Sequence, residues 1–370
     1  MKRRQFMSGA AVAGVTTAAA SALPRPAIAQ GKIEWRMVTT WPRKYPGLGT
    51  GAELLADMIT RGTDGRLTVK VFGANEVVPA FEAIDAVANG NVEMGHGAPY
   101  YWKDKLDAAA YIASIPFGMN ASEQNAWFYY GGGQQLADKA YKALGCKFFP
   151  SGNTGVQMGG WFGKEMHTLE DFKGLKMRIP GLGGEVVKAA GGNVISLPGG
   201  EILPALESGA VDAVEWVGPY NDLAFGLHKA GKLYYFPGWH EPATVLDCFV
   251  GLKKWEALPN DIKAVIEAAN AAVNEIVLAE FNARNGAALT TLVEQHKVVL
   301  KRFPNELMNG LGTLSGVVVN DLAAKDKLSR EVLDSILTFR RDAMAWSSRS
   351  DLAYLTVRAL PFKFPGPSRG

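Results

Sequence analysis

One pattern occurs twice in this sequence, as Glu82-Ala-Ile-Asp-Ala-Val-Ala-Asn-Gly-Asn-Val-Glu-Met94 and as Glu201-Ile-Leu-Pro-Ala-Leu-Glu-Ser-Gly-Ala-Val-Asp-Ala213. The copies align without a gap and have an identical Glu, Ala, Gly and Val at matching positions. Each copy predicts a short amphipathic helix, a helix stop at the glycine, and then an apolar strand. Two such units predict two similar α/β lobes, and a ligand is expected in the cleft where the lobes meet.

The first residues have the composition of an export signal. Lys2-Arg-Arg-Gln-Phe6 precedes an acid-free, alanine-rich stretch from Met7 to Leu23, and Ala27-Ile-Ala29 follows. A basic start, an apolar middle and an A-x-A motif indicate a cleaved signal peptide at residues 1–29, and the arginine pair favours the twin-arginine route over the Sec route. A membrane anchor is the alternative, but the apolar run is short and made mostly of small residues.

The charge of the remaining chain is close to zero. The sequence has 39 basic and 36 acidic residues, and four basic ones lie in the predicted signal, which leaves 35 against 36. This balance gives no electrostatic reason to expect nucleic acid as a partner, and no later apolar run is long enough to insert into a membrane. Cys146 and Cys248 lie far apart in the sequence, which leaves open whether they form a disulfide.

Strands and helices alternate through most of the chain, which predicts mixed, mainly parallel sheets with helices on both faces. From Asp261 on the pattern is almost entirely helical, with acidic capping at its start and a second long piece at Leu328–Trp346. Such a tail could brace the lobes or contact a second copy, and we favour bracing. Strands are expected at Ile33–Thr39, Leu67–Phe72, Val156–Phe162, Leu175–Ile179, Val194–Leu197, Val211–Val217, Tyr234–Pro237 and Val245–Leu252.

The pattern suggests a division of the chain into five parts. Residues 30–150 are assigned mainly to lobe I and residues 151–212 mainly to lobe II. Residues 213–255 are expected to supply return strands shared between the lobes. Residues 256–370 form the helical C-terminal part, and residues 1–29 the signal.

Three short segments are dense in glycine, aromatic and polar residues and lie on or just after predicted strands. Because ligands bind at the carboxyl ends of parallel strands, these segments are candidates for the lining of the cleft. They are Gly152-Asn-Thr-Gly-Val-Gln-Met-Gly-Gly-Trp-Phe162, Gly174-Leu-Lys-Met-Arg-Ile-Pro-Gly181 and Asp212-Ala-Val-Glu-Trp-Val-Gly-Pro-Tyr220.

Polar side chains in these segments suggest two kinds of contact. Arg178 lies among apolar residues, where a guanidinium can bind a carboxylate through two hydrogen bonds. The residues alone favour the alternatives, a solvated charge at the end of a strand or a pair with a protein carboxylate. Glu215 lies in an apolar strand and needs a cation or hydrogen-bond donors, which a protein Arg or Lys could supply. Together with the Gln157 amide, its oxygens suit a hard cation rather than zinc or copper.

Signals for catalysis are weak. The five histidines form no metal-binding pair motif, and no C-x-x-C, complete G-x-G-x-x-G or G-x-S-x-G motif occurs.

The three segments resemble the periplasmic solute-binding subunit of TRAP transporters, the DctP-like family, and most closely its alpha-keto-acid-binding branch. Tyr100-Tyr-Trp102 and Pro237-Gly-Trp239 support the resemblance, which extends from about Lys32 into the C-terminal helices. It implies a two-lobed periplasmic binding protein fold that closes over its ligand without converting it. It also implies a periplasmic location, TRAP membrane permease subunits as partners, and a homodimer through an exchanged C-terminal helix in some members.

The resemblance also assigns roles to individual residues. Arg178 occupies the place of the arginine that binds the substrate carboxylate. Gln157, Glu215, Trp216 and Glu241 match the ligands of a metal ion that bridges to the substrate, usually sodium. The substrate-binding set implied in this way is Tyr100, Tyr101, Gln157, Arg178, Trp216 and Glu241.

Charge balance fits a sodium ion, because Arg178 and sodium would offset Glu215 and one substrate carboxylate. If Glu241 is also ionised, calcium becomes the better candidate. The chain departs from the branch at His240, at Pro242-Ala243 and at Gly97-Ala-Pro99, on the side expected to meet the tail of the substrate. Carboxylate recognition is expected to be unaffected, while the identity of the acid stays open.

The sequence therefore predicts a TRAP solute-binding protein for a small 2-oxo or 2-hydroxy monocarboxylate similar to pyruvate, 2-oxobutyrate or lactate, and not an enzyme. Two alternatives are kept. An exported cofactor-dependent enzyme would agree with a twin-arginine signal, and a sensor-associated carboxylate-binding protein would have the same pocket without a transport partner.

Overall fold

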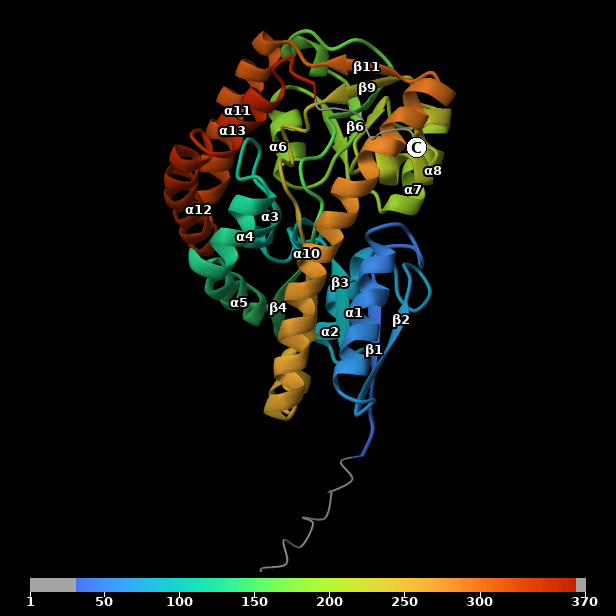
Figure 1. Ribbon diagram of the computed structural model, residues 1–370, viewed down its shortest axis with the longest axis vertical. Helices are drawn as coiled ribbons and strands as arrows, with labels where there is room; N and C mark the ends of the chain where they lie inside the picture. Colours follow the sequence, from blue (N-terminus) through green and yellow to red (C-terminus); the bar gives the residue numbers. More distant parts are fainter. Residues whose placement is uncertain (1–30, 364–370) are drawn as a thin grey trace, which may run out of the picture. The chain divides into compact units, whose positions relative to one another are not determined.

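The computed structural model describes residues 31–363, which fold around two mixed β-sheets (Figure 1). The predicted signal peptide lies outside these described residues. Helices accompany both sheets, and long helices follow at the C-terminal end. The predicted two-lobed α/β class is confirmed. Of the nine strand pairings among the described residues, five are parallel.

Lobe I is the name used here for the five-stranded sheet and the helices close to it in sequence. The strand order is β2-β1-β3-β10-β4. Its strands are β1 (Ile33–Thr39), β2 (Leu67–Phe72), β3 (Met94–Gly97), β4 (Cys146–Asn153) and β10 (Val245–Gly251). Its helices are α1 (Gly49–Gly62), α2 (Ala83–Ala88), α3 (Asp107–Ala113), α4 (Ala121–Tyr130), α5 (Gly133–Ala143) and α9 (Leu252–Glu256), with short 3-10 turns η1 (Ala80–Glu82) and η2 (Pro99–Trp102).

Lobe II is the six-stranded sheet with its helices. The strand order is β11-β9-β5-β8-β6-β7. Its strands are β5 (Gly160–Phe162), β6 (Lys176–Arg178), β7 (Asn193–Ile195), β8 (Ala213–Val214), β9 (Leu233–Phe236) and β11 (Val299–Arg302). Its helices are α6 (Gly181–Ala189), α7 (Gly199–Glu207) and α8 (Pro219–Phe225), with 3-10 turns η3 (Leu169–Phe172) and η4 (Leu227–Lys229).

The two repeat copies lie at equivalent places in the two sheets. The first gives α2 and β3, and the second gives α7 and β8, with Gly90 and Gly209 at φ +77° and +72° after their helices. Glycine is favoured there because a Cβ atom is strained in the left-handed region. β3 pairs in parallel with β1 and antiparallel with β10, while β8 pairs in parallel with β6 and antiparallel with β5. The repeat therefore supplies an internal strand of each sheet.

Several predicted strands are shorter than the sequence indicated, and two differ most. The run Val156–Phe162 is a strand only from Gly160, and Val211–Val217 pairs only at Ala213 and Val214. Gly155 and Gly160 have φ of +68° and +114°, which are not strand angles, so the backbone around Gln157 leaves the ladder. Glu215 and Trp216 follow β8 directly. Gln157, Glu215 and Trp216 therefore lie in loops next to strand ends.

The C-terminal part consists of α10 (Asn260–Thr290), α11 (Asn305–Ala323), α12 (Lys327–Ser347) and α13 (Asp351–Arg358). A π-helical turn, η5 (Thr291–Gln295), follows α10 directly. The expectation of an almost entirely helical tail is wrong at one place, because β11 pairs in parallel with β9 and forms an edge of the second sheet. The expected acidic side-chain cap is also absent at α10: Pro259 precedes the helix, and Asp261 favours it from within the first turn.

The long helices contact both lobes. Helix α10, drawn in orange in Figure 1, packs against β4 and α1 of lobe I and against α8 of lobe II. Helix α11 packs against α6, and α12 packs against α3.

Cys146 and Cys248 are buried free thiols. Within residues 31–363, no helix has both the length and the apolar character that crossing a bilayer demands.

Candidate functional site

The predicted site residues come from strand ends and loops that meet between the two sheets. Arg178 is the last residue of β6, and Glu215 follows β8. Gln157 lies in the loop between β4 and β5, and His240 and Glu241 lie in the loop between β9 and β10. All of these side chains are buried. This position at the carboxyl ends of β6 and β8 agrees with the expected edge of an open α/β sheet.

The centre of the site is a buried ion pair between Arg178 and Glu215. Both side chains are 1% exposed, and Arg178 Nη1 contacts Glu215 Oε1. The guanidinium also donates from Nη1 to the Glu215 carbonyl at 2.9 Å, and from Nε and Nη2 to the Leu197 carbonyl at 3.1 and 3.0 Å. Burial lowers the pKa of Arg178, but the electrostatic effects of Glu215, Tyr101, Tyr100 and Glu241 together raise it on balance. Arg178 is therefore held as a cation by protein oxygens.

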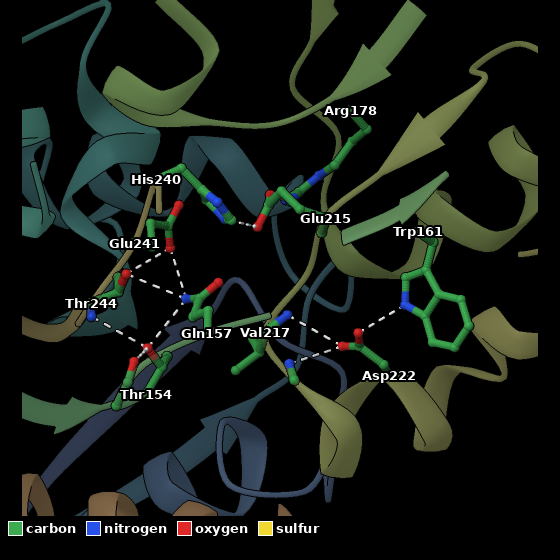
Figure 2. A network of polar contacts seen from close by, with 12 residues as sticks. Thr154, Gln157, Trp161, Arg178, Glu215, Val217, Asp222, His240, Glu241 and Thr244 are labelled. Atoms are coloured by element: carbon green, nitrogen blue, oxygen red, sulfur yellow. Dashed lines mark hydrogen bonds and ion pairs between the residues drawn. The ribbon is translucent and has the colours of Figure 1, made fainter. Parts of the chain in front are cut away.

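The second carboxylate oxygen of Glu215 also has a partner. His240 Nε2 lies 3.2 Å from Glu215 Oε2, and the His240 side chain is fully buried. Burial lowers the pKa of His240, yet the hydrogen bond and the charge of Glu215 raise it on balance. Glu215 thus lies between two nitrogen groups, as Figure 2 shows.

A second hydrogen-bond network surrounds Glu241 (Figure 2). Its Oε2 accepts from Gln157 Nε2 at 2.8 Å and from Thr244 Oγ1 at 2.6 Å. Gln157 Nε2 lies 3.2 Å from Thr154 Oγ1 as well. Burial, followed by the nearby charge of Glu215, raises the pKa of Glu241 to about 7. The carboxyl group of Glu241 therefore keeps its proton to a higher pH than an ordinary glutamate does.

The two networks adjoin, and together they supply a donor set for a cation. Glu215, His240 and Glu241 each offer a ligand atom, and these three atoms lie within 4.8 Å of one another. The amide oxygen of Gln157 is buried and has no hydrogen-bond partner. An unpaired buried carbonyl is costly, and a cation would satisfy it. The donors are mainly hard oxygens, which fit sodium or calcium.

Tyr100 and Tyr101, in η2 of lobe I, face this group. Burial raises the pKa of Tyr101 to about 12, and burial with the charge of Glu241 raises that of Tyr100 well above its usual value. Both hydroxyls stay protonated at neutral pH. The Tyr101 hydroxyl is buried close to Arg178 but makes no hydrogen bond of regular geometry. The start of α6 lies close by, since a Cβ atom on Gly181 would lie 3.3 Å from the Tyr100 Cβ.

Asp222 fixes the turn that follows Trp216. It accepts hydrogen bonds from the Val217 and Gly218 amides at 3.3 and 3.1 Å, from Trp161 Nε1 at 2.9 Å and from the Tyr234 hydroxyl at 2.7 Å. Burial raises the pKa of Asp222 to about 6, although these hydrogen bonds lower it. The Trp216 ring then lies against Arg178, with its centroid 5.1 Å from the guanidinium carbon.

Every residue in the predicted site belongs to this buried group or borders it. Their roles toward a ligand stay predictions. The sequence gives no indication that Thr154, Thr244 or Asp222 belongs to the site. It indicates His240 only as a departure from the branch, on the side expected to meet the tail of the substrate. Thr154 lies inside one of the segments that were singled out, but a threonine in a glycine-rich run carries no signal of its own.

Comparisons with known proteins agree with this geometry. The family model for the bacterial extracellular solute-binding protein, family 7, matches residues 37–325. A monocarboxylate 2-oxoacid-binding periplasmic protein of Nostoc is 42% identical over 358 residues, which cover 96% of this chain and 98% of that protein.

Solved structures of TRAP periplasmic solute-binding proteins are similar as well. The one from Pseudoalteromonas atlantica, with bound sodium and pyruvate, is 40% identical, covers 90% of this chain and 100% of its own, and has a TM-score of 0.86. The one from Colwellia psychrerythraea, with bound calcium and pyruvate, is 40% identical over 88% of this chain and 99% of its own, with a TM-score of 0.85. A third, from Bordetella bronchiseptica, is a mixed occupancy dimer with calcium and picolinate in one site; it is 35% identical over 88% of this chain and 97% of its own, with a TM-score of 0.86. The chain therefore belongs to the DctP family, family 7 of the bacterial extracellular solute-binding proteins, as its three characteristic segments predicted.

Proposed function

We propose that this protein is the periplasmic solute-binding subunit of a TRAP transporter and captures a small 2-oxo or 2-hydroxy monocarboxylate together with a metal ion. The observation that carries the proposal is the buried Arg178 beside an oxygen-rich donor set that contains an unpartnered amide oxygen. The ligands of the related Pseudoalteromonas and Colwellia proteins support the same substrate class.

Arg178 is proposed to bind the carboxylate of the acid. A guanidinium can hold a carboxylate through two parallel hydrogen bonds, and burial strengthens them because little water competes. The Leu197 carbonyl orients the group from one side, and the Trp216 ring lies over it. Tyr100 and Tyr101 are proposed to close the pocket from lobe I, with the Tyr101 hydroxyl available to a ligand oxygen.

Gln157, Glu215 and Glu241 are proposed as side-chain ligands of the cation, with the Trp216 carbonyl as a further ligand. A bound cation would supply positive charge shared between these oxygens and the oxygens of the acid. The protonation of Glu241 decides which cation fits. With Glu241 protonated, Arg178 and sodium balance Glu215 and the substrate, whereas an ionised Glu241 adds a negative charge that calcium would offset.

We further propose that binding occurs without chemical conversion and that the membrane permease subunits receive the acid. Membership of a solute-binding family supports both statements. A periplasmic location is supported by the periplasmic relatives and by the signal-like residues 1–29.

A homodimer through the C-terminal helices is a further part of the proposal. Helix α13 has no buried residue, and Leu352, Tyr354 and Val357 are 61%, 66% and 55% exposed. Leu352 and Leu355 lie on one side of this helix and Tyr354 and Val357 on the other, and exposed apolar side chains gathered in this way are typical of a segment that contacts a protein partner. Light scattering on the full chain should give a dimer mass, Leu352→Glu with Leu355→Glu should give a monomer, and Arg341→Glu on exposed α12 serves as the control.

Calorimetry and thermal unfolding with pyruvate, 2-oxobutyrate or lactate test the central proposal, each with and without sodium or calcium. Binding is expected for at least one acid and should be stronger with the cation. Arg178→Ala should abolish it, while Arg302→Ala, at an exposed position of β11, should not. Equal affinity with and without a cation would contradict the metal-bridged site, and micromolar affinity in Arg178→Ala would contradict the role of Arg178.

A further inference from the structure

Three hydrogen bonds cross from lobe I to the loop and helix of lobe II that carry Trp216. The Tyr45 hydroxyl donates to the Asn221 carbonyl at 2.6 Å and accepts from Trp216 Nε1 at 3.0 Å. The Asn221 side chain donates from Nδ2 to the Pro46 carbonyl at 2.8 Å. Tyr45 and Pro46 precede α1 in lobe I, and Asn221 lies in α8 of lobe II.

Aromatic packing reinforces the same contact. The Tyr45 ring stacks on Phe225 of α8, with centroids 4.0 Å apart and planes 22° apart. Trp216 meets Tyr45 edge-on at 6.4 Å and Trp41 at 6.2 Å. Tyr45 is only 6% exposed, so it contributes buried area as well as hydrogen bonds.

The backbone that presents Tyr45 is fixed by a compact turn. The Tyr45 amide donates to the Pro42 carbonyl at 3.2 Å, and its carbonyl accepts from the Thr50 amide at 3.0 Å. A Cβ atom on Gly49 would lie 2.3 Å from the Pro42 carbonyl oxygen, so the turn can close this tightly only with glycine there. Lobe I therefore offers the Tyr45 hydroxyl to lobe II from a rigid support.

We infer that Tyr45 is a positioning residue that acts across the cleft: it holds Trp216 against Arg178 only when the lobes are together, and thereby stabilises the ligand-bound, closed state. This inference rests on the proposed function. Tyr45 touches neither Arg178 nor Glu215 in the contacts described above, so its effect on affinity passes through Trp216 and through lobe closure. When lobes I and II separate, the three hydrogen bonds and the ring stack break together.

This arrangement predicts a specific kinetic effect. Ligand enters an open form before these contacts exist, so loss of the Tyr45 hydroxyl should not lower the association rate. Dissociation requires the contacts to break, so their loss should speed it. Because affinity is the ratio of the two rates, the faster dissociation should weaken binding by up to roughly tenfold.

The test compares Tyr45→Phe with wild type by calorimetry and stopped-flow kinetics, using pyruvate and calcium. Tyr45→Phe should raise the dissociation rate roughly tenfold without lowering the association rate. Asn221→Ala, which removes only the bond to Pro46, should raise it about threefold. Tyr235→Phe is the matched control, because it also removes a buried hydroxyl. That hydroxyl accepts a hydrogen bond from the Met166 amide, which lies within lobe II. A dissociation rate in Tyr45→Phe equal to that of the control would overturn the inference.

Small-angle scattering separates this inference from the proposed function. Wild type that binds no 2-oxo acid would contradict the proposed function alone. Scattering of the ligand-free proteins then tests Tyr45 directly, and Tyr45→Phe should have a larger radius of gyration than wild type and Tyr235→Phe. Identical curves for the three proteins would overturn the role of Tyr45 in closure.

Discussion

The two repeat copies have the same order of helix, turn and strand, but the side chains at the ends of their strands differ in charge and in their contacts. In the gapless alignment, His96 of β3 corresponds to Glu215 after β8. His96 is neutral and structural: its Nδ1 accepts from Trp41 Nε1 at 3.0 Å, and its Nε2 lies 3.1 Å from the Ser151 carbonyl. Glu215 is salt-bridged to Arg178 and contacts His240.

The difference follows from where each strand ends. β3 is paired on both sides through His96, so the imidazole lies inside the sheet. β8 stops at Val214, so Glu215 and Trp216 lie beyond the ladder and can meet groups from other loops. The repeat thus places a buried histidine inside the sheet of lobe I, whereas in lobe II it places a carboxylate beyond the strand, where groups from other loops can contact it. Substitutions at equivalent positions should separate stability from binding.

The largest effect is expected at Glu215. Glu215→Ala leaves the buried Arg178 without its carboxylate and should lower the free energy of unfolding by about 3–5 kcal/mol, as well as abolish acid binding. Arg178→Met combined with Glu215→Leu removes both charges and should recover the lost stability without recovering binding. Denaturant unfolding measures both variants, and a loss below about 1 kcal/mol in Glu215→Ala would show that the pair does not support the fold.

His96 should instead control the dependence of stability on pH. Burial lowers its pKa from 6.5 to about 4, so the folded state binds this proton less readily than the unfolded chain does. The resulting stability is complete above pH 6.5 and is lost as the pH falls toward 4, by roughly 3 kcal/mol in total. His96→Gln keeps a donor and an acceptor and should remove this part of the acid dependence, while the affinity for the acid stays near wild type.

Unfolding curves at several pH values check the prediction for His96. Glu241, with its raised pKa, changes stability in the opposite direction, but it is present in both proteins and cancels in their difference. His167→Gln is the control, since that side chain is 64% exposed. Parallel pH profiles for wild type and His96→Gln would contradict the prediction.

The helix-ending glycines should behave alike in both copies. Gly90→Ala and Gly209→Ala place a Cβ atom at positive φ where there is open space, so strain alone should cost about 1 kcal/mol at each site. Gly316→Ala in α11, also in open space but within a helix, should stabilise the protein by roughly 0.5–1 kcal/mol. Thermal unfolding measures the loss of stability in each variant. Unequal losses for Gly90→Ala and Gly209→Ala would show that the two turns are not equivalent.

The smallest effect is expected at an ion pair between the lobes. Lys103 Nζ, after η2 of lobe I, lies 2.9 Å from Glu185 Oε1 in α6 of lobe II, and both side chains are partly exposed. Lys103→Glu should weaken acid binding by about two- to fivefold, consistent with an exposed pair worth under about 1 kcal/mol. Glu185 Oε1 also lies 2.9 Å from Lys188 Nζ, so the exchange of charges is made together with Lys188→Ala. Lys103→Glu with Glu185→Lys should then recover affinity relative to Lys103→Glu in the same background, and no recovery would contradict a pairwise effect.

Local signals explain what the sequence could predict. The helix stops at Gly90 and Gly209 depend on one residue and its backbone angle, and β1 and β2 follow from apolar alternation. The family segments led to Arg178, Glu215, Gln157 and Glu241, which the structure brings together. These features require no knowledge of distant partners.

Non-local contacts explain what was missed. The four residues of β11 form a strand only because β9, far earlier in the chain, offers an edge. Gln157 was expected in a strand, but Gly155 and Gly160 take angles that a pattern of apolar residues does not reveal. Asp222 and Tyr45 gain their roles from partners across the fold, and neither belongs to a motif.

In the proposed function, the ion pair of Arg178 and Glu215 also controls which anions bind. Because Glu215 already pairs with the guanidinium, an anion that arrives alone has to displace this buried carboxylate and leave it with His240 as its remaining nitrogen partner, which is costly. A cation that arrives with the acid gives Glu215 a new partner. The site is then expected to bind the acid only together with the cation. Common anions such as chloride or phosphate bind poorly because the protein's own carboxylate competes with them for Arg178.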